Sequence, residues 1–257
     1  MFIKKNFFSI KSTNNDKIKH GFFTRLNGFS KKQFKSLNCS LSNGDERKIV
    51  LKNRELALKK LKLERKKLIL INQTHSSKVI RVNKNNLNKK NNADGMITSL
   101  EDVVLGILTA DCAPIFIYDN KKKFICCLHS GWKGALNNIS KNAIKLFDKY
   151  NIKNTDLVAI IGPCIGAKNY EVSKTFERKF IKKNLEYSKF FRRKNKTKSF
   201  FNLRGIIKYQ LKQLGLKKIH NVGLDTYNNK SLFFSHRRST HKGETSSGRL
   251  INIISLT

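Results

Sequence analysis

Residues 103–134 read VVLGILTADCAPIFIYDNKKKFICCLHSGWKG, and this stretch decides how the rest of the chain is interpreted. It contains three short apolar runs, VVLGIL, IFIY and FICCLH, which are separated by Ala-Asp-Cys-Ala-Pro and by Asn-Lys-Lys-Lys. Short apolar runs bounded by turn-forming residues are typical of buried strands. The stretch therefore predicts three successive strands. Because Cys126 and Cys127 are adjacent in the third run, we expect them to point to opposite faces of the sheet.

Apolar residues at helical spacing predict helices on both sides of these strands. One helix is expected to begin at Asp45 and another to run over Gly134–Tyr150. The lysine- and asparagine-rich stretches Lys84–Asn92 and Lys183–Lys198 are interpreted as surface loops. The remaining expected elements are a strand at Leu157–Ile161, a helix at Leu203–Leu214, and strands near Asn221–Leu224, Leu232–Ser235 and Leu250–Ile254. Strands and helices mixed in this order indicate an α/β or α+β domain.

The composition narrows the class of protein. The chain has 257 residues, of which 39% are hydrophobic, which is enough for one substantial core. Five cysteines do not make a secreted disulfide scaffold, and no apolar run is long enough for a transmembrane helix. Met1–Phe8 lacks the apolar core and cleavage site of a signal peptide. We expect a cytoplasmic protein with reduced thiols and no membrane partner.

The charge is strongly positive, with 54 basic and 17 acidic residues and a net charge of +37. Such a balance is typical of proteins that bind nucleic acid. However, the basic residues are spread over the whole chain, and lysine, asparagine, isoleucine and phenylalanine all have AT-rich codons, so that codon bias alone explains the surface. No helix-turn-helix, zinc-finger or RNA-binding signature accompanies the charge. We therefore expect no specific nucleic-acid partner, and a nucleic-acid-binding protein remains the alternative.

Three residues of types that commonly ligate metals each follow or end an apolar run. His75 follows Leu68–Ile71, Cys112 follows the first strand of the opening stretch, and His129 ends its third. Side chains at strand ends commonly face a shared cleft, and two imidazoles with a thiolate are ligands that zinc or copper prefers. The same residues also fit a thiol hydrolase, with Cys112 as the nucleophile and a histidine as its base. A third interpretation makes them ordinary packing and polar residues at strand ends.

A second cluster is cationic. Arg25 follows His20-Gly-Phe-Phe-Thr, and Arg237 and Arg238 follow Phe233-Phe-Ser-His. Guanidinium groups suit the recognition of phosphate or carboxylate, although in a chain with this charge a solvated basic surface is the simpler explanation.

Taken together, short segments from His20 to Arg249 resemble the bacterial YfiH/YlmD-type family, which is also called the laccase-domain, polyphenol-oxidase-like or purine nucleoside phosphorylase family. The segments that carry the resemblance are His20-Gly-Phe-Phe-Thr-Arg25, Ser36-Leu-Asn38, Gly44-Asp45, Asn53-Arg54, Gln73-Thr-His75, Ala93-Asp-Gly95, Leu108-Thr-Ala-Asp-Cys112 with Pro114, His129-Ser-Gly-Trp-Lys-Gly134, Gly162-Pro-Cys-Ile-Gly166 with Tyr170-Glu171, Phe233-Phe-Ser-His-Arg-Arg238 and Gly248-Arg249. The chain departs from the family at Ser76, where Gly is common, at Lys133, where Arg is usual, at Asp225-Thr226, and in the irregular Ser239–Ser247.

The resemblance implies a single α/β domain over residues 1–257, a four-layer α/β/β/α sandwich with mixed sheets. It also implies one metal ion per chain, zinc or, as a second possibility, copper (Cu²⁺), held by His75, Cys112 and His129. The implied activities are phosphorolysis of adenosine, inosine and 5′-methylthioadenosine, and deamination of adenosine. Copper-dependent phenol oxidation is less expected, because six histidines are too few for a multicopper enzyme. Editing of cell-wall precursors is a further alternative.

The expected roles follow from these reactions. Metal-bound hydroxide would attack adenine C6 in deamination, with Asp111 either as the general acid/base or as a residue that orients a ligating histidine. In phosphorolysis, cationic side chains would hold phosphate, and Asn38 and Gln73 would hydrogen-bond ribose or base. The expected cations are Arg25, Lys133, Arg237 and Arg238. We expect a monomer that binds a purine nucleoside and phosphate.

Overall fold

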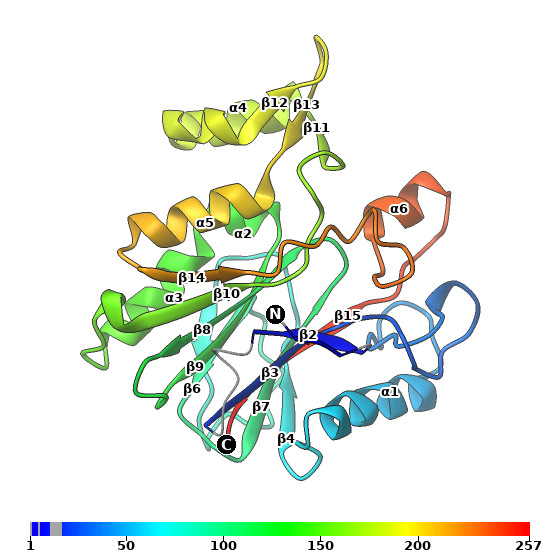
Figure 1. Ribbon diagram of the computed structural model, residues 1–257, viewed down its shortest axis with the longest axis vertical. Helices are drawn as coiled ribbons and strands as arrows, with labels where there is room; N and C mark the ends of the chain where they lie inside the picture. Colours follow the sequence, from blue (N-terminus) through cyan, green and yellow to red (C-terminus); the bar gives the residue numbers. More distant parts are fainter. Residues whose placement is uncertain (1, 5, 11–16) are drawn as a thin grey trace.

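Two six-stranded mixed sheets lie face to face in the computed structural model, which describes residues 2–4, 6–10 and 17–257 (Figure 1). Met1 and Lys5, part of the stretch considered for a signal peptide, lie outside the described residues. The first sheet has the order β1 (Phe2–Lys4), β2 (Phe7–Ser9), β3 (Ile18–Phe23), β15 (Leu250–Leu256), β7 (Val103–Thr109) and β4 (Lys67–Leu70). Its neighbours are antiparallel except for β4 and β7, which run parallel.

The second sheet contains the other two strands of the opening stretch. Its order is β14 (Lys218–Asn221), β10 (Leu157–Ile161), β8 (Ala113–Asp119), β9 (Ile125–Ser130), β6 (Gly95–Thr98) and β5 (Val79–Arg81). The outer pairs, β10 with β14 and β5 with β6, are parallel, whereas β8 pairs antiparallel with both β9 and β10. The chain therefore passes from the first sheet to the second at the turn between β7 and β8.

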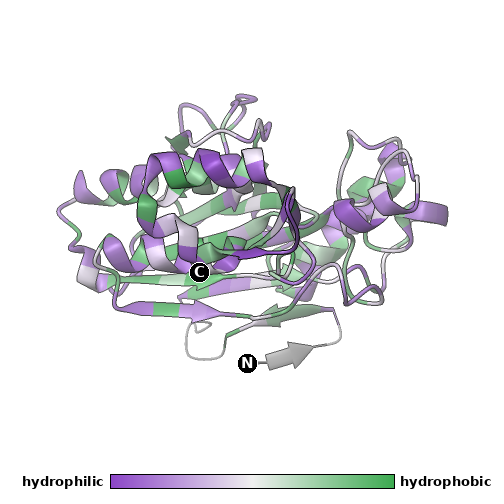
Figure 2. Cartoon of the chain, turned by 90° about the horizontal axis from the view of Figure 1, so that it is seen from above, coloured by the Kyte–Doolittle hydropathy of each residue, from purple (hydrophilic) through white to green (hydrophobic). Residues whose placement is uncertain are grey.

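The alternation of side chains along the strands produces the layers. In β8, Phe116 and Tyr118 belong to the core between the sheets, whereas Ile115 and Ile117 face the helices outside the second sheet. The prediction for the adjacent cysteines is confirmed, because one packs between the sheets and the other under the helices. Hydrophobic residues concentrate on the strands, and hydrophilic ones line the outer surfaces of the helices (Figure 2).

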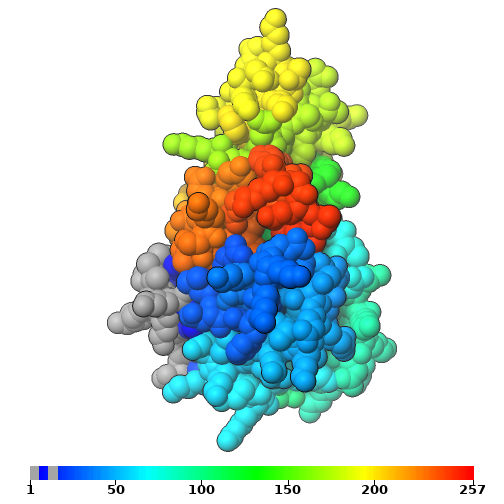
Figure 3. Space-filling view, turned by 90° about the vertical axis from the view of Figure 1, so that its right-hand side faces the viewer, coloured from blue at the N-terminus to red at the C-terminus, as the bar shows by residue number. Residues whose placement is uncertain are grey.

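Helices cover both outer faces and complete four layers. The helix α1 (Arg47–Lys60) packs its buried side on the first sheet, while α2 (Trp132–Leu136), α3 (Ile139–Asp148) and α5 (Leu203–Gln213) cover the second (Figure 1). A small third sheet and α4 (Lys174–Lys183) form the narrow end in Figure 3. Its strands are β11 (Glu171–Ser173), β13 (Lys198–Phe201) and β12 (Phe191–Arg193); the remaining helical elements are α6 (His236–His241) and the 3-10 turns Lys32–Phe34, Asn154–Asp156 and Leu185–Phe190. The expected single-domain mixed α/β fold is confirmed.

The three strands of the opening stretch are confirmed, as are those at Leu157–Ile161 and Leu250–Ile254 and the helices beginning near Asp45 and Leu203. The single helix over Gly134–Tyr150 is wrong. The structure breaks it at Asn138, whose backbone adopts a φ of 50° and whose side chain accepts a hydrogen bond from the Lys141 amide to cap α3. The spacing of apolar residues does not reveal this break, because α2 and α3 both pack their apolar residues on the second sheet.

Three further predictions differ from the structure. No strand forms at Leu232–Ser235 within the described residues, because Phe233 and Phe234 are buried as anchors of a loop, and Ser235 caps α6. The strand expected near Asn221–Leu224 begins earlier, as β14. The loop expected at Lys183–Lys198 instead contains a 3-10 turn and β12, which pack aromatic side chains into the core. Among the described residues, no helix has the length and apolar character to cross a membrane.

Candidate functional site

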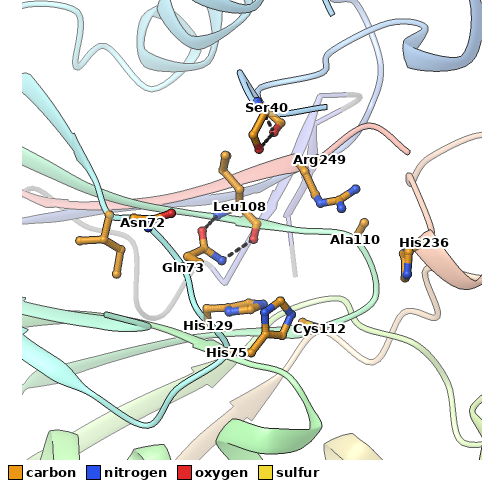
Figure 4. Close-up of a pocket in the computed structure, with 12 residues that line it drawn as sticks. Ser40, Asn72, Gln73, His75, Leu108, Ala110, Cys112, His129, His236 and Arg249 are labelled. Atoms are coloured by element: carbon orange, nitrogen blue, oxygen red, sulfur yellow. Dashed lines mark hydrogen bonds between the residues drawn. The ribbon is translucent and has the colours of Figure 1, made fainter. Parts of the chain in front are cut away.

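The three sequence-predicted metal ligands meet where the two sheets adjoin. His75 lies after β4, Cys112 in the turn between β7 and β8, and His129 near the end of β9. Their ligand atoms lie within 4.8 Å of one another, and Figure 4 shows the two imidazoles and Cys112 gathered on one side of a cavity. The imidazole rings of the two histidines meet edge to face with their centroids 4.8 Å apart. Residues far apart in the sequence thus form one group, which we call the His-Cys-His group.

Asp94, directly before β6, organises this group. Its Oδ1 accepts a 2.7 Å hydrogen bond from His129 Nδ1 and a 3.0 Å bond from the backbone amide of His75. Its Oδ2 accepts bonds from the amide and hydroxyl of Ser76, at 2.6 and 2.7 Å, and from Thr74. One carboxylate therefore holds the imidazole of His129 and the backbone that carries His75, two of the three candidate ligands.

The backbone at His75 shows why this anchor is needed. His75 has a φ of 57°, a left-handed conformation that costs a non-glycine residue free energy unless neighbouring contacts hold it. The bonds that Asp94 accepts from three successive residues hold it. Ser76, a position at which the sequence was expected to depart from the family it resembles, adds a hydroxyl donor to the same carboxylate. The departure therefore reinforces the turn.

The electrostatics favour the thiolate of Cys112. Burial raises the pKa of this thiol, but His129 and His75 outweigh burial and bring the pKa below its usual range. Burial likewise lowers the pKa of His129, yet the Cys112 thiolate and the Asp94 carboxylate together raise it above its usual value. Hydrogen bonds from His129 and Ser76 hold the pKa of Asp94 well below the ordinary range, against the effect of burial.

The donor set fits a metal ion such as zinc. The thiolate is the form of cysteine that binds metals, and it is favoured here. When Nδ1 of His129 donates to Asp94, its Nε2 is left as the ligand atom, which is the arrangement of many histidine metal sites. The third donor, His75, is exposed, so the group is open on the side of the cavity. Three protein ligands with an open fourth position are typical of catalytic zinc.

Asp111 directly precedes Cys112, but its side chain makes hydrogen bonds that stabilise the fold. Its carboxylate is buried and accepts bonds from Thr226 Oγ1 at 2.6 Å, from Ser235 Oγ at 2.9 Å and from the Arg237 amide at 2.7 Å. Its backbone has a φ of 86°. These bonds tie the β7–β8 turn to the loop before α6 and hold the left-handed turn that carries Cys112.

A polar cavity of about 320 Å³ opens on one side of the His-Cys-His group (Figure 4). Arg249, Ser40 and Ser42 contribute a guanidinium and two hydroxyls to it. Apart from the group itself, its other lining residues are Ile71, Asn72, Gln73, Leu108, Ala110 and His236. No carboxylate is among the described residues that line it.

An aromatic cavity of about 280 Å³ lies on the other side. Trp132, Tyr170, Ile165 and Leu203 line it together with Asp111 and Arg237. The two cavities share His75, Ala110, Cys112 and His236 as their common wall. His75 and Cys112 thus lie between the polar cavity and the aromatic one, whereas His129 lines the polar cavity alone.

The four predicted cations take different positions. The guanidinium of Arg25 donates to the backbone carbonyl of Lys35 and lies 4.3 Å from the Phe234 ring centroid. That of Arg238 donates to the carbonyls of Thr226, Tyr227 and Phe233. Neither residue lines the two cavities in the described part of the chain.

The other two cations lie on the side of the aromatic cavity. Arg237 lines that cavity, lies over the Tyr170 ring and donates to the Glu171 carbonyl. Lys133, in α2, is exposed, and its ammonium lies 5.6 Å from the Trp132 ring centroid.

Asn38 and Gln73 are held by the protein. Gln73 donates to the Leu108 carbonyl and accepts from its amide, both at 2.8 Å, while lining the polar cavity. Asn38 is fully buried, and its Oδ1 accepts from the backbone amides of Ser40 and Arg249. Asp225, at another departure from the family, accepts bonds from Gly166, Asn169 and Tyr227.

Sequence reasoning missed three residues of this site: Asp94, His236 and Arg249. Each lies inside a segment that carried the family resemblance, but no local pattern indicates its role. Asp94 acts through residues 18 to 35 positions away. Arg249 reaches the polar cavity because β15 adds to the first sheet beside β7.

Known proteins resemble this chain over most of its length. A family model described as multi-copper polyphenol oxidoreductase laccase matches residues 19–257. A Rickettsia conorii protein named purine nucleoside phosphorylase is 31% identical over 73% of this chain and 77% of its own. The Bacillus subtilis purine nucleoside phosphorylase YlmD is 30% identical over 95% of this chain and 90% of its own.

Solved structures share the fold. A Neisseria meningitidis protein superposes with a TM-score of 0.88 at 25% identity, covering 98% of this chain and 99% of that one. YlmD from Geobacillus stearothermophilus superposes with a TM-score of 0.84 at 25% identity, covering 93% of this chain and 92% of that one.

Proposed function

Since the chain belongs to the multi-copper polyphenol oxidoreductase laccase family, in which relatives are named purine nucleoside phosphorylases, we propose that it splits purine nucleosides with inorganic phosphate at a metal-dependent site. The observation that carries the proposal is the position of the His-Cys-His group between a polar and an aromatic cavity. A nucleoside and a phosphate need two such environments side by side.

The proposed metal is zinc, one ion per chain, held by His75, Cys112 and His129, and copper is the alternative. When bound, such an ion supplies Lewis-acid stabilisation of negative charge on oxygen. The protein's own part is to keep Cys112 as a thiolate and to fix the His129 ring through Asp94. Both features follow from the contacts described above.

The aromatic cavity suits the purine. Trp132 and Tyr170 offer flat apolar surfaces against which a heterocyclic base packs. Arg237, whose guanidinium lies 5.4 Å from the Tyr170 ring centroid, extends that surface and offers a donor to a ring nitrogen. Adenosine, inosine and 5′-methylthioadenosine are the proposed substrates, because they share the purine and the ribosyl C1′.

The reaction exchanges one bond at C1′. A phosphate oxygen forms a bond to C1′ while the bond from C1′ to N9 breaks, and the electron pair of that bond stays with the purine. The purine takes up a proton from solvent, and ribose 1-phosphate (the methylthio form for 5′-methylthioadenosine) is the other product. The protein lowers the barrier by holding the reactants in contact and by balancing the charge on phosphate.

In known zinc deaminases a carboxylate transfers protons beside the attacked base. Asp111 is the carboxylate among the described residues of the aromatic cavity, and its oxygens accept three hydrogen bonds from the protein. The geometry therefore favours phosphorolysis as the main reaction, with deamination as a minor activity.

A thiol hydrolase is the second candidate function. The observation that favours it is the lowered pKa of Cys112 beside His129, because a thiolate–imidazolium pair is also how nucleophilic cysteines are activated. Removal of the metal separates the two functions. A chelator abolishes the proposed phosphorolysis but leaves a purely thiol-dependent hydrolase active.

Product analysis tests the proposal. Purified protein is incubated with inosine, adenosine or 5′-methylthioadenosine, with and without phosphate, before and after chelation, and again after zinc is added back. We expect phosphate-dependent release of the free base that is lost on chelation and restored by zinc. Ammonia release from adenosine without phosphate measures deamination. No base release under any condition would contradict the proposal.

A further inference from the structure

We infer that Arg249, together with Ser40 and Ser42, forms an inorganic phosphate site in the polar cavity. The inference rests on the proposed function and names the side of the His-Cys-His group on which phosphate binds. It assigns the anion to the residue directly before β15, and not to the cations at positions 25, 133, 237 and 238. Figure 4 shows Arg249 and Ser40 across the cavity from the two ligand histidines.

The guanidinium of Arg249 is fixed on one side and available on the other. Its Nη1 donates to the carbonyl and hydroxyl of Ser247, at 2.7 and 2.6 Å. In the described part of the chain, its Nε and Nη2 have no acceptor from the protein, and the residue lines the cavity. A half-buried guanidinium with donors left over is prepared to bind an oxyanion through charge-assisted hydrogen bonds.

Asn38 joins this arginine to the serine turn. Its Oδ1 accepts from the amide of Arg249 at 2.9 Å and from that of Ser40 at 3.2 Å. The hydroxyls of Ser40 and Ser42 lie 3.1 Å apart at the cavity wall. Asn38, which sequence analysis placed on the substrate, is therefore a positioning residue that aligns hydroxyl and guanidinium donors. Figure 3 shows the blue N-terminal segments beside the orange-red segment that leads toward β15.

The charge of the polar cavity favours an anion. No carboxylate is among its described lining residues, whereas the aromatic cavity contains Asp111. Among the four cationic residues predicted to hold phosphate, Arg25 and Arg238 donate their guanidinium hydrogen bonds to backbone carbonyls. An anion therefore finds free cationic donors and no repelling carboxylate in the polar cavity. Phosphate there lies next to the metal ligands and across from the proposed base cavity, as attack at C1′ requires.

Equilibrium dialysis of metal-loaded protein with radiolabelled inorganic phosphate, without nucleoside, tests the site. We compare the wild type with Arg249→Met and with the matched control Arg193→Met, which removes an exposed arginine of β12. Charge-assisted bonds of this kind correspond to a loss of roughly 10- to 100-fold in phosphate affinity for Arg249→Met. The control is expected to bind phosphate as the wild type does.

A second variant covers the case in which Arg249→Met fails to fold. Ser42 is exposed, so Ser42→Asp leaves the fold unchanged, as thermal unfolding verifies, and places a negative charge at the cavity wall. We expect it to weaken phosphate binding by roughly tenfold or more through repulsion, whereas Ser42→Ala weakens it less. Wild-type affinity for phosphate in folded Arg249→Met, or in Ser42→Asp where the arginine variant does not fold, overturns the inference. So does a wild type that binds no phosphate.

The outcome for the site is separate from the outcome for the reaction. If phosphate binds through Arg249 but no purine nucleoside is split, the anion site stands and the proposed function fails. If nucleosides are split with phosphate and Arg249→Met keeps the wild-type Michaelis constant for phosphate, the function stands and the site is wrong. A metal ion that alone held the phosphate would give this second result.

Discussion

Asp111 and Cys112 are neighbours on one turn, yet the fold uses them in opposite ways. The carboxylate of Asp111 is buried and accepts hydrogen bonds from Thr226, Ser235 and the amide of Arg237. The thiol of Cys112 faces two histidines at the wall between two cavities. The thiol of Cys112 is therefore available for chemistry because the neighbouring carboxylate makes the hydrogen bonds that hold the turn.

Replacement of Cys112 is expected to have the largest effect. Cys112→Ser removes the soft thiolate, and we expect metal affinity to fall by more than roughly 100-fold, beyond the effect of losing an orienting partner. Cobalt substitution followed by absorption spectroscopy checks this, because a thiolate ligand gives a charge-transfer band. The band should be present in the wild type and absent in the variant. A variant that keeps it would show that Cys112 is no ligand.

Replacement of Asp111 should affect the fold instead. Asp111→Ala leaves two buried hydroxyls and one half-buried amide without their acceptor, at a cost of about 3 kcal/mol or more in the free energy of unfolding. Urea unfolding measures the loss. Protein that remains folded should still bind one equivalent of metal. A variant with wild-type stability and no metal would reverse the roles assigned to these neighbours.

Asp94 lies between the two extremes, because it supports the fold and orients a ligand. Asp94→Asn weakens its bond to His129 and should reduce metal affinity by roughly 10- to 100-fold. Asp102→Asn, at an exposed carboxylate, is the matched control. Competition with a chromogenic chelator measures both variants. Equal affinities in the two would remove Asp94 from the site.

Two buried histidines extend the comparison to pH. Burial lowers the pKa of His20 to about 3, whereas Cys112 and Asp94 raise that of His129. Because the folded-state pKa of His20 lies below its unfolded value, its contribution to stability is complete above about pH 6.5 and is lost as the pH falls toward 3. Each pH unit in that window costs about 1.4 kcal/mol.

Urea unfolding of the wild type and His20→Gln between about pH 7 and pH 4 isolates this contribution. The slope of stability with pH should be smaller in the variant, which has no imidazole to protonate. Identical slopes would show that His20 does not titrate between the folded and unfolded states.

Sequence reasoning went furthest where the signal is local. The strands around Cys112 and the ends at which the three ligands lie were predictable from apolar runs and turns. The apolar pair Phe233 and Phe234 misled the same reasoning, because a buried loop anchor and a strand have the same composition. The roles of Asp94 and Arg249 could not be predicted from the sequence, because these residues reach the site only when β6 and β15 pair within their sheets.

The central claim is that the His-Cys-His group binds one metal ion and that purine phosphorolysis depends on it. The most direct test measures metal content and phosphate-dependent release of hypoxanthine from inosine on the same preparations of wild type and Cys112→Ala. We predict about one zinc per wild-type chain, with both metal and base release lost in the variant. A folded Cys112→Ala that releases base at the wild-type rate, or a wild type that does so without metal, would contradict the claim.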